Sequence, residues 1–231
     1  MPRDMGRLIE DLNLRNKTLV FRDRAEAGEL LSEKLKHLDP ADTLVLAIPA
    51  GGVPVGYGIA KAIGLLMDVL IVRKIQIPGN TEAGFGALGP DGKTIFNERL
   101  LKTLRLTDEE INQQIGKTKR VLEERERAYR GSRPFPDLKD KVAVIVDDGL
   151  ASGYTMLEAV NFVKRKQAKE IIVAVPTASK SSIGLLLPEV DEIYCLNVRE
   201  FYPFAVAEAY MKWYDVGDEE VITLLKDLWK D

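Results

Sequence analysis

The chain has 231 residues, of which 45% are hydrophobic and 30% charged, and its formal net charge is −3. This length and composition predict a globular α/β domain with additions, and the charge gives no general reason to expect binding to nucleic acid or to a membrane. Neither the single histidine, His37, nor the single cysteine, Cys195, is expected to build a zinc site or a Ser-His-Asp triad, which excludes two large classes of chemistry.

The first part of the chain predicts an arm, a helix and a buried strand. Residues 1–17 are polar and weakly patterned, so we expect a loose arm or a short helix there, and residues 19–21 are a short apolar run. Asp23 suits the N-cap of a helix that ends at Asp39-Pro40. Residues 43–48 form an apolar run that is typical of a strand buried on both faces.

A second helix is predicted over residues 55–63, and the loop before it contains Ala50, Gly51 and Gly52. By itself such a glycine pair is more typical of a tight turn than of a ligand site. The next apolar run, 67–72, predicts a third strand that ends in Arg73-Lys74. A basic pair at the end of a strand is most often a solvated cap.

Residues 75–98 are rich in Gly, Pro and Asn and predict a mobile hairpin. Two nucleotide-binding patterns occur within it. Residues 84–89 match G-x-G-x-x-G, and residues 87–94 match a relaxed Walker A motif. Neither has a buried strand before it and an amphipathic helix after it, so a hairpin is the better interpretation and a P-loop nucleotidase is the weakest functional hypothesis.

A long helix is predicted over residues 107–130, with Thr107 and Glu110 as a capping box at its start. The helix is heavily charged, and we interpret most of these charges as a solvated face with i,i+4 pairs.

The most informative stretch runs from Val142 to Thr155, V-A-V-I-V-D-D-G-L-A-S-G-Y-T. It predicts a buried strand, two carboxylates (Asp147 and Asp148), a loop of small residues and then a helix that Thr155 opens. Backbone N–H groups of such a loop and the positive end of the helix dipole suit a phosphate, and the carboxylates suit sugar hydroxyls or a Mg²⁺ ion. Together these features fit a ribose 5-phosphate. The alternative is a βα turn of another doubly wound domain, in which the acidic pair only caps the following helix or is exposed to solvent.

This stretch resembles the phosphoribosyl-pyrophosphate (PRPP) signature of type I phosphoribosyltransferases, and it is most similar to bacterial and archaeal members with the V-D-D-G-L-A-[ST]-G pattern. The resemblance extends from about residue 21 to 221. It implies that the stretch 151–155 binds the 5′-phosphate, that the loop 50–52 with Arg73 and Lys74 binds pyrophosphate, and that residues 75–98 close over PRPP. The expected substrate contacts are Ala50, Gly51, Gly52, Gly149, Ala151, Ser152, Gly153, Tyr154 and Thr155, and the expected catalytic residues are Asp147, Asp148, Arg73 and Lys74.

The glycine loop departs from the family at one position. Relatives usually carry Arg or Lys where this chain has Ala50, so one cationic pyrophosphate contact is missing. Members of the family often have a non-proline cis peptide bond in this loop, and we therefore expect one at Pro49–Ala50.

Further strands are predicted at 171–175 and 193–198, with a helix around 181–187 between them. The expected fold is α/β, with a doubly wound and mostly parallel sheet, a flexible hairpin loop and a small hood. We expect an arm (1–22), a core (23–200) and a hood or tail (201–231) whose final helix Asp218 caps. The aromatic residues that crowd into the tail are expected either to pack under a cap or to stack on a flat base: Phe201, Tyr202, Phe204, Tyr210, Trp213 and Tyr214.

The leading hypothesis is transfer of 5-phosphoribosyl from PRPP to a nitrogen acceptor, with Mg²⁺ held near Asp147 and Asp148, mainly through PRPP. The alternative is a PRPP- or nucleotide-binding regulatory protein with the same fold, which Ala50 favours. We see no secretory signal and no apolar run near 18 residues in the chain, so a cytoplasmic protein is expected. The sequence identifies neither the acceptor nor the oligomeric state, although a homodimer is the commonest soluble oligomer.

Overall fold

The computed structural model describes residues 5–229 and has the expected mixed α/β fold. Within this part of the chain, the central sheet contains six strands in the order β1-β9-β8-β7-β2-β3, and each neighbouring pair is parallel. The strands are β1 (Arg7–Glu10), β2 (Thr43–Ala47), β3 (Leu66–Val69), β7 (Val142–Val146), β8 (Glu170–Ser179) and β9 (Glu192–Arg199).

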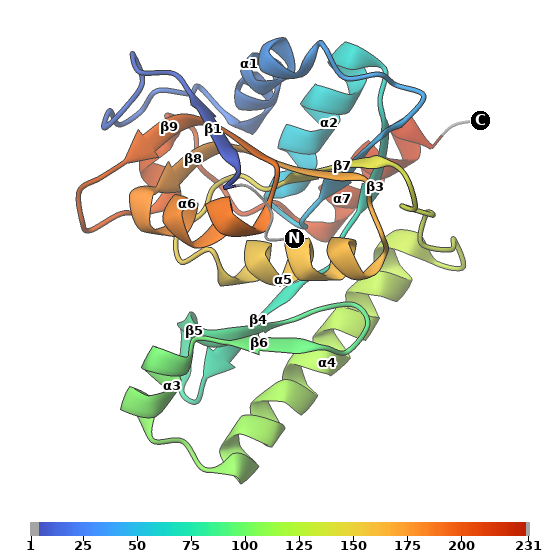
Figure 1. The fold of residues 1–231 in the computed structure, drawn as a ribbon. Helices are drawn as coiled ribbons and strands as arrows, with labels where there is room; N and C mark the ends of the chain where they lie inside the picture. The colour runs from blue at the N-terminus through green and yellow to red at the C-terminus, as the bar shows by residue number, and fades with distance from the viewer. Residues whose placement is uncertain (1–4, 230–231) are drawn as a thin grey trace.

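Helices cover both faces of this sheet (Figure 1). On one face lie α1 (Arg24–Leu35) and α2 (Gly52–Ile63), and on the other lie α5 (Tyr154–Arg165) and α6 (Lys180–Leu186), which a short 3-10 turn, η1 (Leu187–Glu189), extends. Successive strand residues point to opposite faces, so Val45 packs in the core with α1 and α2, and Leu46 packs in the core with α5. Every residue of β2 and β7 is buried, as their apolar sequences predict.

The N-terminal segment contains a strand, which corrects the expected arm. β1 pairs with β9, with Leu8 opposite Ile193, and forms one edge of the sheet. Three of its four residues are half-buried and one is exposed. An edge strand has one neighbour only, so its sequence need not show the continuous apolar run that marks the central strands.

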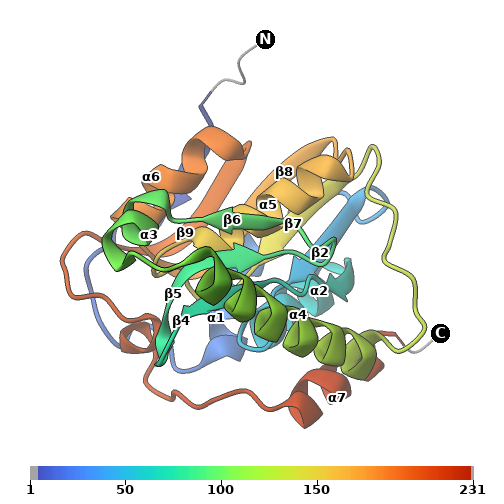
Figure 2. The ribbon, with the colours of Figure 1, turned by 90° about the horizontal axis from the view of Figure 1, so that it is seen from below.

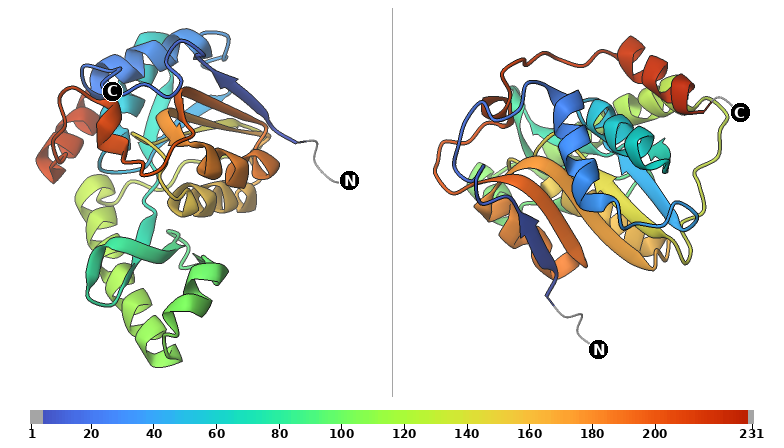
Figure 3. Two further views of the ribbon diagram at one scale, coloured as in Figure 1. Left: turned by 90° about the vertical axis from the view of Figure 1, so that its left-hand side faces the viewer. Right: turned by 90° about the horizontal axis from the view of Figure 1, so that it is seen from above.

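Residues 73–130 form a second layer beyond α5 (Figures 1 and 3). It consists of an antiparallel sheet and two helices: β4 (Arg73–Ile77), β5 (Asn80–Leu88), β6 (Thr94–Phe96), α3 (Glu98–Leu104) and α4 (Asp108–Arg130). The predicted strand over 67–72 is thus wrong at its end, because β3 stops at Val69 and the basic pair opens β4. Residues 70–72 remain buried where the chain passes from one sheet to the other, so the apolar run continues beyond the end of the strand.

The two nucleotide-binding patterns lie in the antiparallel sheet. Ala87 and Leu88 end β5, a turn follows, and Thr94 begins β6. The chain after the Walker-like pattern is therefore a strand and not a helix. The P-loop nucleotidase hypothesis is wrong.

The charged helix α4 begins as predicted. Thr107 Oγ1 accepts a hydrogen bond from the Glu110 N–H (3.2 Å), and the Glu110 carboxylate accepts one from the Thr107 N–H (2.8 Å). At its other end α4 lies beside the last helix, α7 (Asp218–Leu228), as Figure 2 shows. The predicted Asp218 cap is wrong: Gly217 takes the N-cap position, and the Asp218 carboxylate accepts a hydrogen bond from the Tyr129 hydroxyl (2.5 Å) instead. Among residues 5–229, no helix combines the length and the hydropathy needed to cross a membrane.

Candidate active site

The two strand–loop–helix units predicted from the sequence meet at one edge of the parallel sheet. β2 and β7 are neighbours, with Ala47 opposite Val146, so the loops that follow them start side by side. From there α2 leads to β3 over one face of the sheet, and α5 leads to β8 over the other (Figure 1). Ligands of open α/β sheets bind outside the carboxyl ends of the strands at such a switch point.

A cavity of about 370 Å³ lies at this edge. Five of the nine predicted substrate contacts line it, namely Gly149, Ala151, Ser152, Gly153 and Thr155. Two of the predicted catalytic residues, Asp147 and Lys74, face it as well, together with Ala83, Gly84, Leu150, Met156 and Val206. Tyr154 opens α5 but is not part of the lining. The volume falls within the usual range for a small-molecule site.

The predicted phosphate loop is held in place by β8. The Leu150 N–H donates to the Thr177 carbonyl (3.0 Å), and the Leu150 carbonyl accepts from the Ser179 N–H (3.0 Å). Gly153 then takes φ +81° at the N-cap of α5, and no side chain caps the helix. The first N–H groups of α5 and the positive end of its dipole are thus directed at the loop, which is the arrangement that binds anions.

The two carboxylates of the acidic pair have different surroundings. Asp147 lines the cavity, and its Oδ1 accepts a hydrogen bond from the Asp148 N–H (2.8 Å). The Asp148 carboxylate instead accepts one from Arg24 Nε (2.8 Å). Burial and then the Asp148 charge raise the pKa of Asp147 well above its usual value. Burial also raises the pKa of Asp148, against the opposing effect of Arg24.

Arg24 is a residue of the site that sequence reasoning missed. It is the first residue of α1, and its side chain is only 4% exposed. A cation in the first turn of a helix opposes the helix dipole, and this is the only hint in the sequence that Arg24 has a partner elsewhere.

The glycine loop packs behind the acidic pair rather than lining the cavity. The peptide bond between Pro49 and Ala50 is cis, as expected. A Cβ atom on Gly51 would lie 1.9 Å from Asp148 Oδ2, and one on Gly52 would lie 2.7 Å from the Val146 carbonyl oxygen. These two glycines are therefore required by close packing against the end of β7 and the acidic pair.

The two residues of the basic pair differ in whether they reach the cavity. Lys74 lines both the cavity and a small pocket of about 60 Å³ against α4, whereas Arg73 lines only the small pocket. Burial and then the neighbouring Arg125 lower the pKa of Arg73. The structure therefore brings only Lys74 of the predicted pair to the cavity.

A model of the phosphoribosyl transferase domain family matches residues 22–208. The chain belongs to this family. Two Mycobacterium tuberculosis proteins (strains CDC 1551 / Oshkosh and ATCC 25618 / H37Rv), named "Putative phosphoribosyl transferase MT0597" and "Putative phosphoribosyl transferase Rv0571c", are each 32% identical to it over 212 residues. These matches cover 92% of this chain and 48% of each relative, so the chain spans about half the length of the curated relatives it matches. The crystal structure of TT1426 from Thermus thermophilus is similar over 91% of this chain and 99% of that one, with 33% identity and a TM-score of 0.74.

The segment 75–98 of this phosphoribosyltransferase domain is bound to α5 through its turn. Arg165 donates two hydrogen bonds to Asp91 (2.8 and 3.0 Å) and one to Glu158 (2.7 Å). Glu158 is 1% exposed, and burial raises its pKa. This network holds Lys74 and Gly84 of the small sheet near the phosphate loop; closure of the segment over a substrate remains a prediction.

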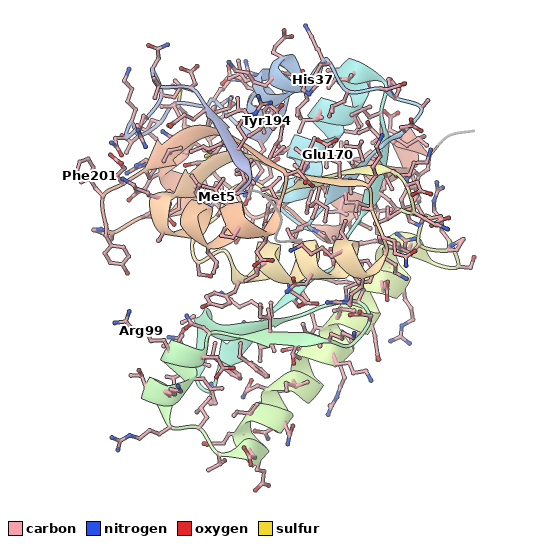
Figure 4. The ribbon with its side chains drawn as sticks, viewed as in Figure 1. Met5, His37, Arg99, Glu170, Tyr194 and Phe201 are labelled. Atoms are coloured by element: carbon pink, nitrogen blue, oxygen red, sulfur yellow. The ribbon has the colours of Figure 1, made fainter. Side chains whose placement is uncertain are left out.

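Of the tail aromatics, Tyr210 packs in the core as expected, and stacking on a flat base stays a prediction. Tyr210 is buried and packs on Phe21, with 5.6 Å between ring centroids, after the short 3-10 helix η2 (Val206–Ala209). Phe201 and Tyr202 are 70% and 94% exposed, and Phe201 projects from the loop after β9 (Figure 4). These two residues and Phe204 line a second cavity, of about 350 Å³.

The single histidine and the single cysteine lie outside the cavity lining. His37 lies beside Tyr194 of β9 (Figure 4), with 3.5 Å between its Nε2 and the tyrosine hydroxyl. Cys195 is buried, and burial raises the pKa of its thiol.

Proposed function

We propose that the protein transfers a 5-phosphoribosyl group from PRPP to a nitrogen nucleophile, of which a nucleobase is the expected class, and releases pyrophosphate. The observation that supports this proposal is the cavity in which a carboxylate, an uncapped helix start and a lysine face one another. A carboxylate suits sugar hydroxyls, the helix start suits a phosphate, and a lysine suits a second anionic group. PRPP carries sugar hydroxyls, a phosphate and a second anionic group, its pyrophosphate, on one molecule.

In this proposal the residues 151–155 bind the 5′-phosphate through backbone N–H groups and the hydroxyls of Ser152 and Thr155. Asp147 accepts hydrogen bonds from the ribose and lies near the positive charge that develops on the ring as pyrophosphate leaves. Lys74 balances negative charge on the leaving group. Catalysis then consists of orientation and electrostatic stabilisation, and no nucleophilic side chain is required.

We also propose that Mg²⁺ accompanies PRPP, held by Asp147 and by oxygen atoms of the substrate. Among residues 5–229 there is no cluster of three or more His, Cys, Asp or Glu side chains that could hold a metal ion. Mg²⁺ is commonly bound by one or two carboxylates and substrate phosphates, so this donor set fits. When bound, the ion would neutralise charge on the pyrophosphate.

The test is pyrophosphate release from PRPP and Mg²⁺ with a panel of purines, pyrimidines and other amines. We expect release with at least one acceptor. Combined Asp147→Asn and Asp148→Asn substitutions should lower PRPP affinity or turnover at least tenfold. The matched control changes two exposed aspartates outside the cavity, Asp137→Asn and Asp140→Asn, and should leave both unchanged. Wild-type kinetics in the first double variant would contradict the assigned role of the acidic pair.

The second candidate is a regulatory protein that binds PRPP or a nucleotide without turnover. Ala50 favours it, because an alanine supplies no side-chain cation to the glycine loop, and the lining of the cavity includes only one cation, Lys74, among the described residues. Calorimetric PRPP binding with no pyrophosphate release from any acceptor would support this candidate. An Ala50→Arg variant that gained release would identify the missing cation as the cause.

A further inference from the structure

We propose that a small pocket between β4 and α4, here called the α4 pocket, binds a phosphate-sized oxoanion and thereby regulates the active-site cavity. The residues of its lining that matter here are Arg73, Lys74 and Gln76 from β4, and Gln114, Lys117 and Thr118 from α4. The family resemblance assigned Arg73 and Lys74 to pyrophosphate but predicted no site that includes α4. Binding of the anion is independent of the proposed function, whereas its effect on the cavity rests on that function.

One face of α4 forms the wall of the pocket opposite β4. Gln114, Lys117 and Thr118 recur at helical spacing, and this face packs against β4 (Figure 2). Gln114 is 8% exposed, and within residues 5–229 its side-chain amide forms no hydrogen bond, although it is not fully closed off from solvent. Thr118 is 9% exposed, and its hydroxyl donates to the Gln114 carbonyl (2.8 Å). Since buried amides are normally hydrogen-bonded, the Gln114 amide is available to an occupant of the pocket.

Arg73 is a partly buried charge without a counter-ion. Its side chain forms no hydrogen bond or ion pair with any residue that the structure describes, and its neighbour Arg125 is a second cation. Asp218 is the carboxylate that acts on Arg73, but it accepts from the Tyr129 hydroxyl (2.5 Å) and lies 4.0 Å from Arg125. Lys117 likewise forms no ion pair within the described ranges. Buried charges are normally paired, so an anion in the pocket would supply the partner that Arg73 lacks.

The lining and the size of the pocket indicate the class of anion. Arg73, Lys74 and Lys117 contribute three cations, and no carboxylate of a described residue lines the pocket. Guanidinium and ammonium groups bind phosphate through charge-assisted hydrogen bonds, and an amide N–H adds a neutral donor. The volume is about 60 Å³, against about 370 Å³ for the active-site cavity. This space suits one tetrahedral oxoanion and is too small for a nucleotide.

Lys74 connects the α4 pocket to the active-site cavity. It lines both, and among the described residues it is the only cation that lines the cavity. A lysine carries a single ammonium group on a flexible stem, so the group that turns toward an anion in the α4 pocket leaves the cavity. Phosphate in the pocket should therefore weaken PRPP binding, given the role proposed for Lys74.

Phosphate binding is tested first, without PRPP and without turnover. In ¹⁵N NMR the side-chain amide signal of Gln114, assigned with Gln114→Ala, should shift to saturation as inorganic phosphate is added. Arg73→Met and Lys117→Met should each raise the Kd obtained from this signal at least fivefold. The matched control is Lys119→Met, because Lys119 is an exposed lysine of the same helix that pairs with Glu123 and does not line the pocket.

Two results of these titrations would overturn the site. The first is a Gln114 signal that does not respond to phosphate, or that gives the same Kd in the wild-type protein and in all three variants. The second comes from a parallel titration with pyrophosphate. If Arg73→Met and Lys117→Met weaken pyrophosphate binding and leave phosphate binding unchanged, these cations belong to the active site and not to a separate pocket. Both variants should fold, because neither side chain leaves an ion-pair partner behind, and thermal unfolding without phosphate checks this.

Initial rates test the regulation of the cavity. Phosphate should raise KM for PRPP in the wild-type protein, and the rise should be at least threefold smaller in Lys117→Met, whose kcat and KM without phosphate should match the wild-type values. Direct competition at residues 151–155 persists in this variant, so the difference between the two proteins reports the α4 pocket. An equal rise in both would overturn the regulation. Failure of the wild-type protein to use PRPP would overturn the proposed function and would leave the phosphate titration valid.

Discussion

Gly51→Ala adds one methyl group at the contact between the glycine loop and the acidic pair. The backbone of Gly51 has φ −62° and ψ −32°, a right-handed helical conformation that alanine adopts freely. The substitution therefore introduces no conformational strain of its own. Its effect comes from collision, because the new Cβ would lie 1.9 Å from Asp148 Oδ2 and 2.6 Å from Asp148 Cγ.

The size of the effect follows from these distances. Real Cβ atoms stay at least 3.0 Å from other heavy atoms, so the loop or the carboxylate has to move by about 1 Å. A shift of that size takes the 2.8 Å hydrogen bond from Arg24 to Asp148 outside hydrogen-bond range. Overpacking costs about 1–3 kcal/mol, and a hydrogen bond to a charged group contributes about 1.5–3 kcal/mol. We expect a loss of about 3 kcal/mol in the free energy of unfolding, which lowers Tm by roughly 6–12 °C in a domain of this size.

Thermal unfolding and calorimetric PRPP binding measure the two consequences. PRPP affinity should fall at least tenfold, because the displaced carboxylate belongs to the loop that lines the cavity. The control is Gly116→Ala in the interior of α4, where a Cβ would meet nothing within 4 Å, and where alanine should raise stability by about 0.5–1 kcal/mol. If Gly51→Ala unfolds at the wild-type temperature and binds PRPP equally well, the glycine loop does not pack on the acidic pair as described.

Three further outcomes are expected. Burial and the Asp148 charge raise the folded-state pKa of Asp147, so the stability that protonated Asp147 contributes is present below the unfolded pKa of about 3.9 and is lost as the pH rises through the folded pKa. In urea unfolding, Asp147→Asn should therefore gain stability relative to the wild-type protein between pH 4 and pH 7. A difference in unfolding free energy that does not change with pH would contradict this prediction. Arg165→Met leaves the buried Glu158 without its cation and should cost about 3 kcal/mol in urea unfolding, whereas Lys119→Met, at an exposed pair, should cost less than about 0.5 kcal/mol. The buried Cys195 thiol has a raised pKa and should react with iodoacetamide only in denaturant; labelling of the folded protein would refute this.

The sequence alone determined the parts of the site that are local in the chain. The run of buried residues before Asp147, the small-residue loop and the start of the helix that follows lie within fourteen residues of sequence, so their spacing is sufficient to predict a strand, a phosphate-binding loop and a helix. The second loop, at Gly51, could be placed at the same edge because parallel strands align their carboxyl ends. The capping box at Thr107 and the cap at Asp23 were predictable for the same reason, since each contact spans three residues.

Only the tertiary structure decided which of these residues meet. Arg24 and Asp148 are 124 residues apart, and no local pattern links a helix start to a loop that lies across the sheet. Contacts between distant segments likewise decide the pairing of β1 with β9, the presence of Lys74 but not Arg73 at the cavity, and the stacking of Trp213 on Arg24. Periodicity and loop chemistry indicate the elements one by one, but which carboxylate of the acidic pair lines the cavity is set by the side chains that the finished fold brings against it.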